Sequence, residues 1–134
     1  MNKIFLLSLL VSINIGATVS KKVNIESDTV EYVQDTNSIF FLNNVKIASD
    51  NINVSAREAI YDNESEIISV FGFPSVITSG KKGTKFKGTA EKIIIFSDEK
   101  VHLLGNASMS YENINISSNK IVFNPQSGSL ISEE

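Results

Sequence analysis

The amino-acid sequence repeats itself, and this repeat constrains the fold more than any other feature. Four blocks of ten residues align without gaps, and a second apolar block follows each of the first three. The first blocks are residues 23–32, 52–61, 86–95 and 114–123, and the second blocks are residues 39–47, 68–76 and 101–109. Self-similarity at a nearly fixed period indicates one supersecondary unit stacked several times. Because the fourth copy stops after its first block, the chain carries about three and a half copies.

The composition of the blocks is typical of short β-strands. Ile, Val, Phe, Tyr, Thr and Ser dominate them, whereas polar clusters such as Asn43-Asn44 and Gly105-Asn106 separate them. Helical periodicity is hard to find after residue 22. The sequence therefore predicts an all-β domain of antiparallel strands.

The first blocks share a change of phase. Apolar or small residues occupy offsets 0, 2 and 4 and then 7 and 9, whereas strict alternation would continue at 6 and 8. The inward face therefore switches by one residue at Asp28-Thr29, Arg57-Glu58, Glu91-Lys92 and Asn119-Lys120. Such a slip reverses the faces unless the strand bends or bulges there. We therefore expect each strand to bend at the same place, as strands do when they turn between two sheets or roll into an open barrel.

The second blocks predict one apolar face. Its alternate residues are Ile39, Phe41, Val45 and Ile47, then Ile68, Val70, Pro74 and Val76, then Val101, Leu103, Ala107 and Met109. The intervening residues, such as Lys46 and Ser69, are mixed, so we expect the opposite face to be mainly polar. The apolar set has no Trp and is mostly of medium size. It would either pack as a plain core or leave a groove for acyl chains.

The first twenty residues differ from the rest of the chain. The basic segment Met1-Asn2-Lys3 precedes an apolar run from Ile4 to Val11, and small and polar residues follow up to Ser20. That order is typical of a cleaved secretory signal peptide, residues 1–20, and predicts a mature domain of residues 21–134 outside the cytoplasm. The alternative is a retained membrane anchor, although a span needs about 20 mostly apolar residues.

Composition argues against several classes of function. The 134 residues carry 12 basic and 15 acidic side chains, and this net charge of −3 argues against nucleic-acid binding. There is no Cys, which excludes disulfides and Cys-ligated metals. The single His, His102, falls on the polar parity of its strand and is expected at the surface.

Two other candidate sites have simpler interpretations. The segment Gly80-Lys81-Lys82-Gly83-Thr84 lacks the spacing of a phosphate-binding loop, so it predicts an extended hairpin. The carboxylates are spread over predicted turns and the polar face, so we expect solvated charge in place of an acid–base pair or a calcium site. The sequence therefore predicts no enzyme, cofactor or metal centre.

The segments SDTVEY (residues 27–32) and IFFLNNVKI (residues 39–47), with their later counterparts, carry a family resemblance. They resemble the OstA-like repeat of the LptA family of periplasmic lipopolysaccharide transport proteins, which includes LptC and the N-terminal domain of LptD. The resemblance covers residues 23–131, and Leu104-Gly105-Asn106-Ala107 is its most family-like part. One departure is Asn43, which stands where the other two copies have Gly. The resemblance implies a slightly twisted antiparallel β-jellyroll that is open at its ends.

The resemblance also implies a role. It predicts a periplasmic bridge protein that shields the lipid A acyl chains of lipopolysaccharide between the two membranes, with LptC-like and LptD-like jellyrolls as partners. The expected lining of the lipid groove is Val30, Tyr32, Ile39, Phe41, Val45, Ile47, Ile68, Val70, Val76, Val101, Leu103 and Met109.

Two alternatives to this role remain open. One is an LptC-like protein that keeps residues 4–19 as an anchor, and the other is a structural β-repeat surface protein with a dry core. The open ends predict unpaired edges at residues 23–32 and 114–123, and pairing of these edges would give head-to-tail homo-oligomers. A monomer with capped ends is the competing prediction.

Overall fold

The computed structural model describes residues 11–15, 21–81 and 85–133. All regular secondary structure within these ranges is β-strand. Over the same ranges, we find no helix with the length and hydropathy needed to cross a membrane. The strands are β1 (Val11–Ile15), β2 (Lys21–Glu26), β3 (Thr29–Val33), β4 (Ser38–Ala48), β5 (Ile52–Asp62), β6 (Ile67–Ser79), β7 (Phe86–Ile95), β8 (Val101–Tyr111), β9 (Ile114–Phe123) and β10 (Leu130–Glu133).

All ten strands belong to one antiparallel sheet. The order is β1-β2-β4-β5-β6-β7-β8-β9-β10, and β3 pairs with β4. Strands that follow one another in sequence are mostly neighbours because short turns join them. The first block of the chain forms two strands, of which β2 pairs with the second half of β4 and β3 with the first half. The all-β fold predicted from the repeat is confirmed.

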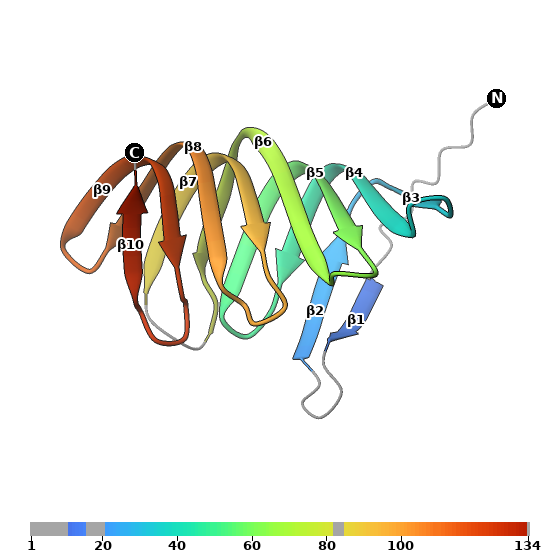
Figure 1. Ribbon diagram of the computed structural model, residues 1–134, viewed down its shortest axis with the longest axis horizontal. Helices are drawn as coiled ribbons and strands as arrows, with labels where there is room; N and C mark the ends of the chain where they lie inside the picture. The colour runs from blue at the N-terminus through green and yellow to red at the C-terminus, as the bar shows by residue number, and fades with distance from the viewer. Residues whose placement is uncertain (1–10, 16–20, 82–84, 134) are drawn as a thin grey trace.

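The predicted bends are also confirmed. The pairing register shifts at the middle of every long strand pair, between Leu42 and Val45, Ser55 and Glu58, Phe71 and Ser75, Thr89 and Lys92, and Leu104 and Ala107. Each bulge increases the local bend of its strand. Figure 1 shows the strands turning over along the upper edge of the molecule, so that each long strand contributes to two walls.

Residues with left-handed backbone conformations lie at these bends. Gly105 has a φ of +84°, and a Cβ on it would overlap the carboxylate of Glu91. Asn43 occupies the corresponding position in the first copy with a φ of +69°. Because Asn tolerates the left-handed region better than most residues, it can replace Gly there.

The two halves of the rolled sheet form walls that face each other. The front wall, nearer the viewer in Figure 1, consists of β3, β10 and residues 38–42, 58–62, 67–71, 92–95, 101–104 and 120–123. The back wall consists of β1, β2 and residues 45–48, 52–55, 75–79, 86–89, 107–111 and 114–117. The strand turns of both walls lie on the side opposite the bends.

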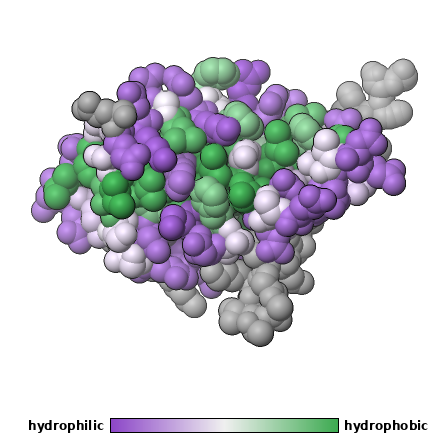
Figure 2. Space-filling model, in the orientation of Figure 1, coloured by the Kyte–Doolittle hydropathy of each residue, from purple (hydrophilic) through white to green (hydrophobic). Residues whose placement is uncertain are grey.

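The outer surfaces of the walls differ, which corrects one prediction. The outer surface of the back wall is mostly polar, as in the paired row Asn53, Thr78 and Lys87. On the front wall the corresponding row contains Ile60 and Ile94, and Figure 2 shows apolar residues in a band across this face. The expectation of a mainly polar opposite face therefore holds for the back wall and is wrong for the front wall.

The ends of the sheet agree only partly with the predicted edges. Strand β2 is covered on its outer side by β1, and β10 covers Lys120 to Phe123 of β9. Residues 114–119 of β9 remain unpaired on that side among the described strands, as does the outer edge of β3. Of the predicted signal peptide, residues 1–10 and 16–20 lie outside the described residues, and so do Lys82 to Thr84 of the predicted hairpin.

Candidate functional site: the apolar interior

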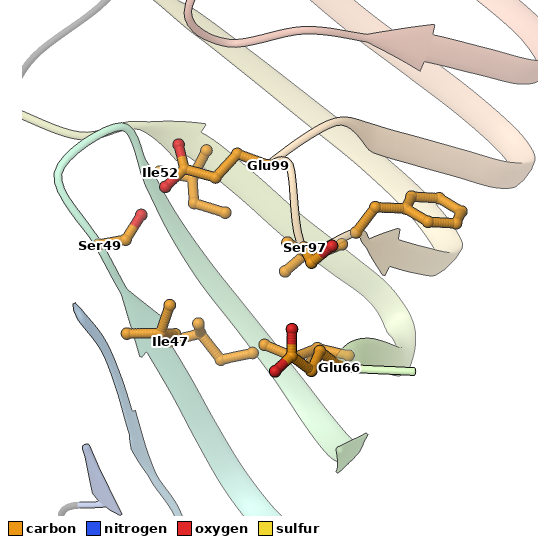
Figure 3. Close-up of a pocket in the computed structure, with 10 residues that line it drawn as sticks. Ile47, Ser49, Ile52, Glu66, Ser97 and Glu99 are labelled. Carbon is orange, nitrogen blue, oxygen red and sulfur yellow. The ribbon is translucent and has the colours of Figure 1, made fainter. Parts of the chain in front are cut away.

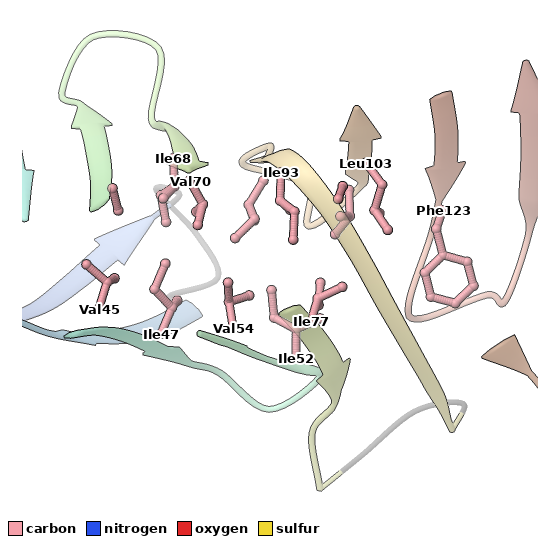
Figure 4. Packing of buried hydrophobic residues seen from close by; sticks show 14 of the residues in the cluster. Val45, Ile47, Ile52, Val54, Ile68, Val70, Ile77, Ile93, Leu103 and Phe123 are labelled. Atoms are coloured by element: carbon pink, nitrogen blue, oxygen red, sulfur yellow. The ribbon is translucent and has the colours of Figure 1, made fainter. Parts of the chain in front are cut away.

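The inner surfaces of the two walls enclose the apolar side chains of the chain. Figure 4 shows the two sets pointing toward each other across the interior. The set from the back wall includes Val45, Ile47, Val54 and Ile77, and the set from the front wall includes Ile68, Val70, Ile93, Leu103 and Phe123. Burial of such side chains is the main force that holds the walls together.

The phase change in the first blocks correctly assigns the inward positions. In β5 it selects Ile52 and Val54 before the bend and Ala59 and Tyr61 after it, and all four are buried. Without the bulge at residues 56–57, the second pair would point outward. The bend therefore lets one strand contribute inward side chains to both walls.

Most of the expected lining residues point into the interior. Eight of the twelve are buried, namely Phe41, Val45, Ile47, Ile68, Val70, Val101, Leu103 and Met109. Val30 and Ile39 are half-buried and pack against this cluster, whereas Tyr32 is 57% exposed.

Val76 does not lie on the inner face. At its bend, β6 has one more residue between paired positions than β8 has. After the bend, the inward and outward positions of β6 are therefore exchanged relative to those of β8. Ser75 and Ile77 are fully buried, and Val76 points outward. The prediction that Val76 lies on the inner face is therefore wrong.

The prediction omitted several residues that complete the interior. They lie in the four first blocks, one of which begins in β2, and include Ile25, Val54, Ile93, Ile121 and Phe123. The offsets 0, 2, 7 and 9 of the repeat carry the signal that identifies them. Gly88 also faces the interior, where the packing leaves no room for a side chain. A Cβ on it would lie 2.8 Å from the Leu103 side chain and 3.2 Å from the Ile77 side chain.

The apolar interior reaches the surface at both ends of the roll. Tyr32 continues the inner row of the front wall at the β3 end, where it pairs with Ile39. Ile114 continues the inner row of the back wall at the β9 edge, next to Tyr111. Tyr32 is 57% exposed and Ile114 is 58% exposed, whereas the residues between them in these rows are mostly buried. The inward side chains thus form a continuous apolar interior with exposed residues at each end, which we call the apolar passage.

Between the ends, side chains fill this passage. An apolar hollow lies where the turns of the two walls approach each other, and Figure 3 shows Ser49 and Ile52 on one side and Glu66 and Ser97 on the other. Its free interior is about 10 Å³, room for roughly one water molecule. A guest of acyl-chain size therefore requires the walls to move apart.

A polar contact joins the walls along this seam. The side-chain amide of Asn51, in the β4–β5 turn of the back wall, donates a hydrogen bond of 2.5 Å to a carboxylate oxygen of Glu99, in the β7–β8 turn of the front wall. Within the back wall, the N–H of Gly80 donates a hydrogen bond of 2.9 Å to the Asn51 carbonyl. Both Asn51 and Glu99 are buried. A hydrogen bond between a buried amide and a carboxylate is stronger than a neutral one, so this contact fastens the two turns.

The interior is a low-polarity environment because apolar side chains line it, and this affects the buried hydroxyl of Tyr61. Burial raises the pKa of the Tyr61 hydroxyl above its usual value, and the nearby carboxylates of Glu66 and Asp62 raise it further. Among the described residues, no group of three His, Asp or Glu side chains is placed to hold a metal ion. The chemistry that this arrangement supports is the non-covalent sequestration of apolar groups.

Comparisons with known proteins agree with this geometry. Residues 24–129 match the family model described as LptA/(LptD N-terminal domain) LPS transport protein. The solved structures that are similar include LptH, the LptA-homologous periplasmic component of the lipopolysaccharide transport device from Pseudomonas aeruginosa. The TM-score is 0.73 at 15% identity, over 84% of this chain and 82% of that one. No curated protein sequence matches the chain.

Proposed function

Because this chain belongs to the family of LptA and LptD N-terminal-domain lipopolysaccharide transport proteins, we propose that it is a periplasmic bridge protein. Its interior would shield the lipid A acyl chains of lipopolysaccharide between the inner and outer membranes. The protein performs no chemical step and needs no cofactor.

One observation carries the proposal: the apolar interior runs the length of the roll and is exposed at both ends. A closed β-sandwich would cover the ends of its core with loops, but Tyr32 and Ile114 remain more than half exposed. An acyl chain that enters there replaces water on apolar side chains, which is worth about 25 cal/mol per Å² of buried surface. Such binding needs no cationic site, which suits a chain with a net charge of −3.

The sheet edges support contacts with other jellyrolls. Cleavage after Ser20 would remove β1 and leave the outer edge of β2 without its partner strand. Unpaired edges of this kind accept strands from another chain. LptC-like and LptD-like jellyrolls, or a second copy joined head to tail, would then extend the apolar passage from one domain to the next.

The filled interior favours one alternative, a structural β-repeat protein with a dry core. The free volume of about 10 Å³ at the seam is what such a core would have. The two functions differ in whether the interior accepts lipid.

Adjacent leucines provide the experiment. Leu103 is fully buried and points inward, whereas its neighbour Leu104 points outward. We expect Leu103→Asn to reduce the capture of lipopolysaccharide, measured by displacement of a fluorescent lipopolysaccharide probe, and Leu104→Asn to leave it unchanged. Circular dichroism checks that both variants are folded.

Milder substitutions cover the case in which Leu103→Asn does not fold. Leu103→Met conserves volume and retains folding, and Leu103→Ala removes part of the lining. Equal capture of lipid by all folded Leu103 and Leu104 variants would contradict the proposal and favour the dry core.

A further inference from the structure

The outer surface of the front wall is not explained by the proposed lipid passage. Its residues alternate with the buried inner row of Phe41, Val70 and Leu103, so they must point away from the interior. Ile60 and Ile94 lie on this outer surface, each of them partly exposed, and no other described strand covers it. Contiguous exposed apolar patches on soluble proteins usually mark interaction sites.

Between β4 and β10 the central outer row has the same pattern in either direction, and beyond β4 it continues to Glu31 of β3. From β4 to β10 it contains Phe40, Ile60, Ser69, Ile94, His102, Val122 and Ile131. Two apolar residues at each end are followed inward by one polar residue, with Ile94 of β7 at the centre. Contact between two identical surfaces about a two-fold axis requires this kind of self-complementarity.

The neighbouring outer row offers one pair of opposite charges and one apolar pair about the same centre. It contains Leu42, Glu58, Phe71, Lys92, Leu104, Lys120 and Glu133. Reversal of this row about β7 places Glu58 opposite Lys120 and Phe71 opposite Leu104, and at the ends Leu42 opposite Glu133. Lys120 also lies 3.7 Å from Glu133 of its own chain, so Lys120 would contact two carboxylates in the dimer. At the centre Lys92 would meet its own copy. Its ammonium group, however, lies 5.4 Å from the ring centre of Phe71 and so is turned to one side.

We propose that this outer surface is an interface between two copies of the chain. The copies pack front wall to front wall about a two-fold axis parallel to β7, which buries the central outer row against itself. An anionic lipid surface fits less well, because Glu31, Glu58 and Glu133 lie on the same face. The contact differs from head-to-tail edge pairing, because it closes at two copies.

The size of the surface indicates a weak dimer. Six strand spacings of about 4.8 Å make the central row about 29 Å long. The three outward rows through Asp62, Ile60 and Glu58, each about 6.7 Å wide along the strand, together cover about 20 Å. The buried area is then about 600 Å² per copy, which is the lower limit for a specific interface. We therefore expect a dimer that dissociates on dilution.

Sedimentation equilibrium of the purified protein over a range of concentrations tests the proposal. The expected result is a monomer–dimer equilibrium. Glu58→Lys and Lys120→Glu should each weaken dimerisation about tenfold, because each disrupts two symmetry-related charge pairs. The double variant Glu58→Lys/Lys120→Glu should restore it. Lys87→Glu, on the outer surface of the back wall, is the matched control and should have no effect.

A second variant tests the centre of the interface. Ile94→Glu should abolish the dimer while lipid capture stays normal, which separates this proposal from the proposed function. Three results would overturn the proposal. The protein could remain a monomer up to about 1 mM, or the double variant could fail to restore the dimer. The third result is assembly into more than two copies to the same extent in the Glu58→Lys and Lys120→Glu variants as in the unsubstituted protein. Thermal unfolding checks that each variant is folded.

Discussion

The front and back walls share one interior but have different outer surfaces. Each long strand contributes to both walls and bends at its middle, so the difference arises within single strands. On the outside of the back wall, most side chains other than Val76 are Asn, Ser, Thr or Lys, whereas Ile60, Ile94 and Val122 lie on the outside of the front wall. The inner rows supply the buried core, so the apolar residues on the outside of the front wall are available for the proposed contact between two copies.

The largest expected effect separates the inner and outer faces of the front wall. Ile93 is fully buried, and its neighbour Ile94 points outward. Ile93→Thr should lower the free energy of unfolding by about 3 kcal/mol, because it creates a cavity and buries a hydroxyl. Ile94→Thr should change it by less than about 1 kcal/mol. Urea denaturation at low protein concentration measures both, and equal losses would contradict the assignment of the two faces.

A smaller effect should follow from making the outer surfaces alike. The variant Phe40→Thr/Ile60→Thr/Ile94→Thr gives the front wall a polar outer row similar to that of the back wall. We expect it to bind much less of a fluorescent dye that reports exposed apolar surface, and to remain folded. Asn53→Ile/Thr78→Ile on the back wall should have the opposite effect. Dye binding that is unchanged in both variants would show that the outer surfaces of the two walls do not differ in exposed apolar area.

The bends between the walls allow a finer test. In two copies an amide donates to an acid across the bend: Asn44 to Asp28 and Asn106 to Glu91, both at 2.7 Å. In the second copy, Arg57 lies 5.8 Å from the ring centre of Phe73 instead.

Changes at these bends should have modest effects. Asn106→Ala should cost about 1 kcal/mol of stability, and Arg57→Asp/Phe73→Asn should stabilise the protein by a similar or smaller amount. Thermal unfolding measures both changes. If the Asn106→Ala variant is as stable as the unsubstituted protein, the bends do not depend on these hydrogen bonds.

The smallest expected effect is a pH dependence on the front wall. Burial lowers the pKa of His102 below its usual value, and the positive charges of Lys120 and Lys100 lower it further, against smaller opposing effects of Glu133 and Asp98. The unfolded chain therefore binds the proton more readily, so stability should fall slightly as the pH drops below about 6.5. Lys120→Gln should raise the pKa, as measured by NMR of this single histidine. An unchanged pKa would contradict the proximity of the two side chains.

The repeat predicts much of this fold because its signals are local. A one-residue phase change, as at Arg57-Glu58, fixes the bend and assigns Val54 and Ala59 to the interior without any long-range information. The inward placement of Phe41, Val70 and Leu103 follows from the same alternation.

Two features could not be predicted in this way. The bend of β6 holds an extra residue, so the ungapped alignment places Val76 on the wrong face. Its sequence signal is Pro74, which cannot donate a hydrogen bond to the sheet. The contact of Asn51 with Glu99 joins turns 48 residues apart, and the repeat contains no information about that distance.

The central claim is that acyl chains enter between the walls, and a covalent lock on the seam tests it most directly. The chain has no native Cys, so Asn51→Cys/Glu99→Cys can be joined by a short thiol-specific cross-linker. We predict that the cross-linked protein no longer captures lipopolysaccharide, whereas the same variant without cross-linker does. Full capture by the cross-linked protein would show that lipid binds without separation of the walls, and would contradict this account.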